Sequence, residues 1–279
     1  MGSLAQFVMS GRKQAILASV LLGLVPLFNL LGPVVVGLVT LRKGVTEGLV
    51  VFAWAVLPLA GWAYVGDIVP VIMLLGILGL ATLLRETGSW EFTLLAAIAV
   101  GAGVEIYLRL QPGLIELMLA QFEEVLRQGQ VENFDMAMFR ESMFSFIAAV
   151  YMCLAILLLM LARWLQARLY NPGGFQQEFH RLRMEQKVAG VLVVLMLLIE
   201  FSGIVPSNWV VYLMLPLVFS GLALVHGVVA IKKLAGMVLV VLYAMVMFRP
   251  VLLLVVMLAI VDSWYDFRAR LANSGPPVE

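Results

Sequence analysis

The chain has 279 residues, of which 63% are hydrophobic and 13% are charged, and its mean hydropathy is +1.05. Soluble domains are about 45–50% apolar and about 25% charged, so this composition excludes a soluble globular protein and predicts a polytopic membrane protein. The net charge of +1 argues neither for nor against nucleic acid, because the basic residues follow the predicted membrane sides and form no single patch. We expect no nucleic-acid partner.

The first apolar segments are expected at residues 14–28 and 31–41. Basic residues before an apolar run are also typical of a signal peptide, but no small-residue cleavage site follows, which favours an uncleaved membrane helix. As one continuous helix the two segments would span about 42 Å at 1.5 Å per residue, which is long for one crossing and short for two. Asn29, Gly32 and Pro33 favour a break. We therefore expect two helices that turn near the outer face, with a single crossing as the alternative.

Three longer apolar segments follow at residues 48–64, 68–84 and 90–108, with a tight outer turn at Gly66 and Asp67. Each is long enough to cross a bilayer as a helix.

The interval from 111 to 141 is polar and rich in Glu. Its first half, 112–128, begins with a proline at a helix start and repeats apolar residues at helical spacing. This pattern predicts an amphipathic helix on the outer membrane surface. Asn133 and Asp135 are expected to cap the next helix. The apolar face of the amphipathic helix would consist of Ile115, Leu119, Phe122 and Leu126.

Segment six, at residues 142–161, leads into a basic connector at 164–187. Its helix is expected to continue to Tyr170, because the Asn-Pro-Gly-Gly sequence that follows stops a helix. Aromatic and apolar residues then recur at helical spacing among charges, which predicts an interfacial helix before segment seven at 188–204.

Segment eight, at residues 209–231, ends at a pair of lysines. The last apolar stretch, 234–264, is interrupted near its centre by the Arg-Pro pair at 249–250. We expect two short helices that turn at this pair, with one kinked helix as the alternative.

These segments predict an all-α bundle of about eight to ten membrane segments, because backbone groups in lipid must bond within their own segment. We divide the chain into an N-terminal six-segment core, a cytoplasmic basic connector, C-terminal membrane helices and a flexible cytoplasmic tail, at residues 1–163, 164–187, 188–265 and 266–279.

The basic residues predict the orientation. Of 18 Lys and Arg residues, this topology places 14 on the cytoplasmic side, as the positive-inside rule requires. We therefore expect a multi-pass protein of a cytoplasmic membrane with both termini in the cytoplasm. The four outer basic residues would be Arg109, Arg127, Arg140 and Arg249.

Ionisable groups inside hydrocarbon are costly, so each is a candidate for function. Glu105 and Glu200 fall late in their segments, at the same predicted level as other polar residues near the outer face. Together they would form a polar cavity that opens outward, with the amphipathic helix as a lid. A structural ion pair between Glu105 and Arg109, four residues apart, is the alternative. The candidate ligand-binding residues are Asn29, Asp67, Glu105, Arg109, Glu200, Asn208 and Arg249.

The basic connector has two interpretations. Its arginines would bind lipid phosphates as an ordinary membrane anchor, or it would dock a cytoplasmic protein partner through paired helices. The candidate docking residues are Arg163, Arg168, Phe175, Phe179, Arg181 and Arg183.

The sequence contains no recognisable enzyme constellation. The only histidines are His180 and His226, and the single cysteine, Cys153, is predicted far from both, so we expect no metal site. There is no P-loop and no dinucleotide-binding loop after a strand, so we expect neither a cofactor nor catalysis.

The connector and the residues just before it contain a series of short patterns: Arg163-Trp164-Leu165-Gln166, Asn171-Pro172, Phe175, Glu178-Phe179 and Leu182-Arg183. Together with Leu41-Arg42-Lys43-Gly44 earlier in the chain, this series resembles the YybS-like family of bacterial predicted membrane proteins of unknown function. That family is thought to be distantly similar to the substrate-binding components of energy-coupling-factor transporters and to the shape-determining protein MreD. The resemblance implies a core of about six helices, a ligand pocket that opens outward, and an energising ATPase as partner.

These observations predict a membrane protein that binds or transports a small solute through an outward cavity. The alternative is a membrane scaffold that oligomerises or recruits a cytoplasmic partner through the connector. The sequence leaves the ligand, the energy source and the presence of a homo-oligomer open.

Overall fold

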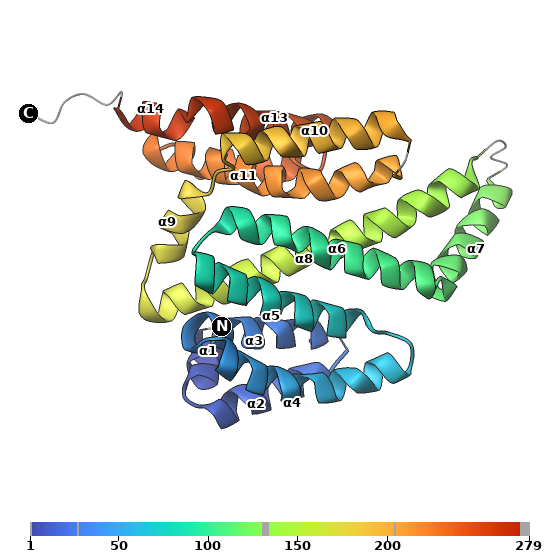
Figure 1. The fold of residues 1–279 in the computed structure, drawn as a ribbon, viewed down its shortest axis with the longest axis horizontal. Coiled ribbons are helices and arrows are strands. Elements are labelled where there is room, and N and C mark those ends of the chain that lie inside the picture. The colour runs from blue at the N-terminus through green and yellow to red at the C-terminus, as the bar shows by residue number, and fades with distance from the viewer. Residues whose placement is uncertain (1, 27, 130–133, 204, 274–279) are drawn as a thin grey trace, which may run out of the picture.

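The computed structural model describes residues 2–26, 28–129, 134–203 and 205–273. These residues form 14 α-helices, two short 3-10 helices and no strand. The predicted all-α polytopic class is confirmed, because several of the helices are long and apolar enough to cross a membrane. Figure 1 shows the helices stacked in three groups, in the order of the chain.

The first group contains a helical hairpin whose second half is the centre of the packing. α2 (Arg12–Leu24) and α3 (Gly32–Lys43) are joined through the 3-10 helix η1 (Asn29–Leu31), and the chain reverses between them, so the predicted break is confirmed. Ten consecutive residues of α3, from Gly32 to Leu41, are buried. They are buried because four helices surround α3, namely α2, α4, α5 and α8. The other members of the group are α1 (Gly2–Met9) and α4 (Val45–Tyr64).

The middle group consists of three long helices, α5 (Val69–Thr87), α6 (Trp90–Leu110) and α8 (Met136–Tyr170). Local signals in the sequence set their ends. The Ser89 hydroxyl accepts from the backbone N–H of Phe92 at 3.3 Å at the start of α6. The Asp135 carboxylate accepts from the N–H of Met138 at 2.9 Å at the start of α8, so the predicted Asp135 cap is confirmed; Asn133 lies outside the described residues. α8 ends at Tyr170, as predicted.

The amphipathic helix α7 (Gly113–Gln128) packs against the first turns of α8, and the two project beyond the rest of the bundle (Figure 1). Ile115 and Leu119 are buried, and the ring of Phe122 stacks on that of Phe139 at 4.5 Å between centroids. The predicted apolar face is therefore correct, but it covers α8. We expected it to lie on lipid, and sequence alone does not tell these two apolar partners apart.

The third group contains α10 (Gln186–Ser202), α11 (Val210–Ile231) and α13 (Arg249–Tyr265), and it is reached through α9 (Gly174–Arg181). α12 (Met237–Met245) and α13 are bent by 116° at the break between them, so the expected turn near Arg249 is confirmed. The 3-10 helix η2 (Ser207–Trp209) precedes α11.

The end of the chain differs from the flexible tail that we expected from residue 266. Residues Phe267–Asn273 form a further helix, α14. Arg268 holds it against the connector, because its Nη1 donates to the backbone carbonyls of His180 and Leu182 at 2.8 Å each. Residues 274–279 lie outside the described residues.

The number of long helices is lower than the eight to ten segments expected. In the described part of the chain, five helices are long and apolar enough to cross a membrane, or six if the bent pair is one span. α2, α3 and α12 have only 13, 12 and 9 residues. At 1.5 Å per residue the longest of these is about 20 Å, which is short of a hydrocarbon core of about 30 Å.

The bundle has two distinct ends. We call the end that holds α9 and α14 the connector end, and the end from which α7 and α8 project the hairpin end (Figure 1).

Contacts bring basic residues from distant parts of the sequence to the connector end. Arg12 pairs with Glu47 at 2.5 Å, and Arg85 donates to the carbonyl of Leu41 at 2.6 Å.

Candidate functional site

Glu105 is the centre of a buried polar cluster in α6, near the hairpin end, and is 1% exposed. Its Oε1 accepts from Nε and Nη2 of Arg109 at 2.9 and 2.7 Å, from Nε1 of Trp209 at 3.0 Å and from the hydroxyl of Ser145 at 3.3 Å. Its Oε2 accepts from the hydroxyl of Tyr212. Burying a carboxylate is costly unless such donors surround it. We call these five residues the Glu105 cluster.

The Glu105 cluster joins three parts of the fold. Glu105 and Arg109 come from α6, Ser145 from α8, and the aromatic donors from η2 and α11. Gly101, one turn before Glu105, allows the close approach, because a Cβ there would lie 3.1 Å from the Tyr212 ring. The carboxylate therefore ties α11 to the α6–α8 pair, and α11 cannot separate from them without breaking hydrogen bonds.

Arg109 connects the buried carboxylate to the hairpin. Its Nη1 lies 2.9 Å from Oε2 of Glu141 in α8, and its side chain is 33% exposed against 1% for Glu105. The guanidinium also lies over the ring of Phe144, 5.2 Å from its centroid. One arginine thus bridges an inaccessible carboxylate and an accessible one.

The structure brings together only part of the predicted outer cavity. Glu105 and Arg109 meet, and Asn208 lies next to Trp209 of the cluster. The other four predicted ligand-binding residues are outside it: Asn29 is buried in η1, and Asp67, Glu200 and Arg249 are exposed on separate elements. Asp67 lies in the turn before α5, where its carboxylate accepts from the N–H of Val69 at 3.2 Å.

At the connector end, two of the predicted docking arginines are held within the chain. Arg163 donates through Nε to Oε2 of Glu178 at 2.9 Å, and Trp90 donates to the same oxygen at 3.4 Å. Arg183 lies 2.5 Å from a carboxylate oxygen of Asp266. These contacts fasten α9 to α6, α8 and the end of α13, so these arginines stabilise the connector.

The remaining docking residues divide by exposure. Arg168 and Arg181 are exposed, while Phe175 and Phe179 are partly buried. Phe175 and Phe179 stack on each other at 6.1 Å between centroids. Only the two exposed arginines are therefore positioned to meet a partner without rearrangement.

A second buried ion pair was not predicted from the sequence. Asp262 in α13 is fully buried, and its Oδ2 lies 2.6 Å from Nη2 of Arg268, whose side chain is 11% exposed. A carboxylate within the apolar 234–264 stretch was the signal that could have revealed it. Ser145, Trp209 and Tyr212 gave no such signal, because their partner is more than thirty residues away in every case.

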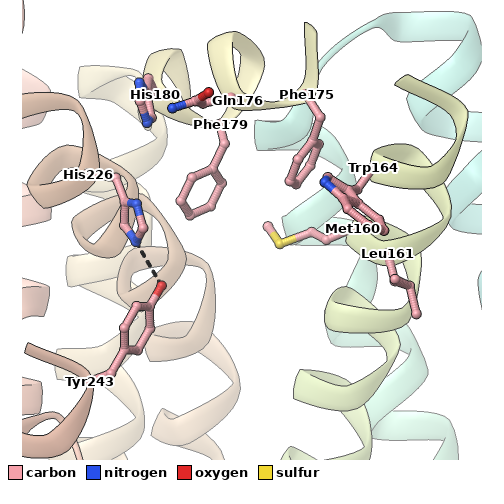
Figure 2. Close-up of a pocket in the computed structure, with 9 residues that line it drawn as sticks. All are labelled: Met160, Leu161, Trp164, Phe175, Gln176, Phe179, His180, His226 and Tyr243. Carbon is pink, nitrogen blue, oxygen red and sulfur yellow. Dashed lines mark hydrogen bonds between the residues drawn. The ribbon is translucent and has the colours of Figure 1, made fainter. Parts of the chain in front are cut away.

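Four cavities of about 330 to 520 Å³ lie at the connector end. At the hairpin end, Glu105 and Arg109 of the predicted polar cavity lie in the Glu105 cluster. Figure 2 shows the connector-end cavity of about 500 Å³, which is lined by aromatic and histidine side chains. Among the described residues, no group of three or more His, Cys, Asp or Glu side chains is placed to hold a metal ion.

Comparison of the chain with protein-family models, with curated proteins and with solved structures gave no match.

Proposed function

We propose that this membrane protein binds or transports a small solute at its hairpin-end half, without catalysis, and that the Glu105 cluster is the gate of that site. The observation that carries the proposal is a carboxylate with 1% exposure whose donors come from α6, α8, η2 and α11. Ionisable groups inside a membrane protein are functional candidates by default. The YybS-like resemblance, with its outward pocket and energising ATPase, is consistent with this proposal.

The closed cluster contains the groups that a polar solute needs. Arg109, Trp209 and Tyr212 all donate to Glu105. When α11 moves away from α6, a hydroxylated solute would enter between them, donate to Glu105 and accept from Trp209 and Tyr212. The bonds to the solute would replace the hydrogen bonds within the Glu105 cluster that break when α11 separates from α6. The opening therefore costs few hydrogen bonds in total.

We propose that the connector end faces the bacterial cytoplasm, with both termini on that side. Support comes from the basic residues, because 14 of the 18 Lys and Arg residues belong to segments at the connector end. The solute would then enter from the outer face.

A scaffold remains the second candidate function. The observation in its favour is the exposure of Arg168 and Arg181, with Arg168 over the ring of Trp164 at 5.3 Å, since aromatic and arginine side chains are enriched at protein interfaces. Its partner would be a cytoplasmic protein or a second copy of the chain.

Replacing Glu105 by Gln tests the proposed solute site. The substitution keeps the size of the side chain but removes the charge that orients Arg109. We expect native mass spectrometry of gently purified wild-type protein to detect a bound small molecule, and the Glu105→Gln variant to lose at least about nine tenths of it, because a charge-assisted hydrogen bond contributes about 1.5–3 kcal/mol.

The matched control is Glu141→Gln, which removes the exposed carboxylate from the same arginine. It should retain the bound molecule. Equal occupancy in both variants would refute the solute site. The same spectra report subunits and co-purified proteins, so a partner without any small molecule would favour the scaffold.

A further inference from the structure

The connector-end cavity in Figure 2 is bounded by four helices that are far apart in the sequence. α8 forms one wall, α9 forms the roof, and α11 and α12 form the opposite wall. Its volume of about 500 Å³ falls within the range of about 300–1,000 Å³ that is usual for small-molecule sites. It lies at the opposite end from the Glu105 cluster, so it is a separate site.

Flat side chains dominate the walls of this cavity. The ring of Phe179 stacks against Phe175 with an interplanar angle of 24° and meets His226 edge-on at 5.3 Å between centroids. Trp164 and Met160 face them from α8 (Figure 2). Such walls favour a planar ring, which stacks on aromatic faces and contacts methionine sulfur.

The polar groups of the cavity are hydrogen-bonding but uncharged. Nε2 of His226 lies 2.8 Å from the hydroxyl of Tyr243, and Gln176 and His180 add further polar atoms from the roof. Burial, together with the nearby charge of Arg268, lowers the pKa of His180 below its ordinary value, which favours the uncharged ring. No Lys, Arg, Asp or Glu is among the described residues that line the cavity.

The neighbouring cavity is different in character. It has a volume of about 450 Å³, shares His180 with the first, and is lined by Arg181, Arg183, Arg268 and Asp266. An anionic headgroup would prefer that cavity, because charged donors bind phosphate and carboxylate most strongly. The absence of charge in the first cavity therefore selects an uncharged ligand.

The cavity also borders an apolar exterior. Tyr243 is 47% exposed, and its helix α12 presents Met237 and Val240 at 67% and 62%. A ligand dissolved in the membrane can therefore reach it from the side without crossing a polar surface.

We propose that this cavity binds an uncharged, planar ring compound that carries carbonyl acceptors and an apolar tail, the chemistry of a membrane-soluble quinone. The ring would lie against Phe179. A ring carbonyl would accept from the Tyr243 hydroxyl or the His226 N–H, in place of the bond that these two residues share.

The test is titration of a short-chain 1,4-naphthoquinone into the full-length protein in phosphatidylcholine nanodiscs. Tryptophan fluorescence is the readout, because Trp164 lines the cavity. We expect saturable quenching whose amplitude falls in Trp164→Phe. Tyr243→Phe and Phe179→Leu should each raise the dissociation constant about fivefold, which corresponds to about 1 kcal/mol for one hydrogen bond or one ring contact.

The control is Tyr265→Phe, which changes an exposed tyrosine at the same end but outside the cavity. It should bind the probe like the wild type, and all variants should unfold at the same temperature as the wild type within a few degrees. Dodecyl phosphate should not displace the probe. Quenching that never saturates, unchanged affinity in both cavity variants, or saturable binding of dodecyl phosphate in place of the quinone would overturn the proposal.

Discussion

Two buried carboxylates, Glu105 and Asp262, mark the two ends of the bundle, and each is held by one arginine. The first pair was visible in the sequence, because Glu105 and Arg109 are four residues apart on one helix. The pair of Asp262 and Arg268 was not visible in the sequence, because α13 ends between these two residues and Arg268 then folds back. Asp266 adopts a positive φ of 47°, and this break lets Arg268 fold over Asp262.

Replacing Asp262 by Asn should destabilise the protein by about 3 kcal/mol, because it leaves a largely buried guanidinium without its carboxylate. The matched control is Asp266→Asn, which breaks a half-exposed pair with Arg183 and should cost less than about 1 kcal/mol. Unfolding in increasing concentrations of SDS measures both. Equal losses in the two variants would show that Arg268 does not depend on Asp262.

At the scale of helices, close packing depends on glycines that the sequence identifies only in part. Glycines within apolar segments predict close helix contacts. Gly76 and Gly101 fit this, since a Cβ would lie 2.8 Å from Val100 in the first case and 3.1 Å from Met152 in the second. Gly79, in the same helix as Gly76, has no neighbour within 4 Å. Which face of a helix meets a neighbour is decided by tertiary structure, so composition alone could not separate these residues.

Gly221→Ala tests a helix crossing in which the nearest atom of the neighbouring helix belongs to its backbone. A Cβ at Gly221 in α11 would lie 3.0 Å from the carbonyl carbon of Val255 in α13 and closer still to its oxygen. Because backbone atoms cannot rotate away, the helices must separate, and we expect a loss of about 2–3 kcal/mol.

The control for this substitution is Gly190→Ala in α10, where a Cβ meets nothing within 4 Å. It should stabilise the protein by up to about 1 kcal/mol through helix propensity. The SDS midpoint should therefore move in opposite directions for the two variants. A shift in the same direction would contradict the described crossing.

At the scale of the whole molecule, hydropathy and charge predicted the class and most of the long apolar helices, because apolar length and breaker residues are local properties. The short terminal helices α1 and α14 were not predicted. The meeting of α6, α8 and α11 around Glu105 could not be predicted, since it depends on residues such as Ser145 and Tyr212 that are polar at only one atom. The cavities at the connector end were also missed, because the aromatic residues that line them were assigned to a protein partner.

Sidedness is the claim on which the proposed function depends most. In a Cys153→Ser background, single cysteines at Gln128 in α7 and at Lys232 after α11 would report the two ends, because each lies on an exposed part of the chain. A membrane-impermeant maleimide applied to intact cells should label Gln128→Cys, and should label Lys232→Cys only after the membrane is opened. Labelling of Lys232→Cys in intact cells, with Gln128→Cys protected, would contradict the account and place the Glu105 cluster on the cytoplasmic side.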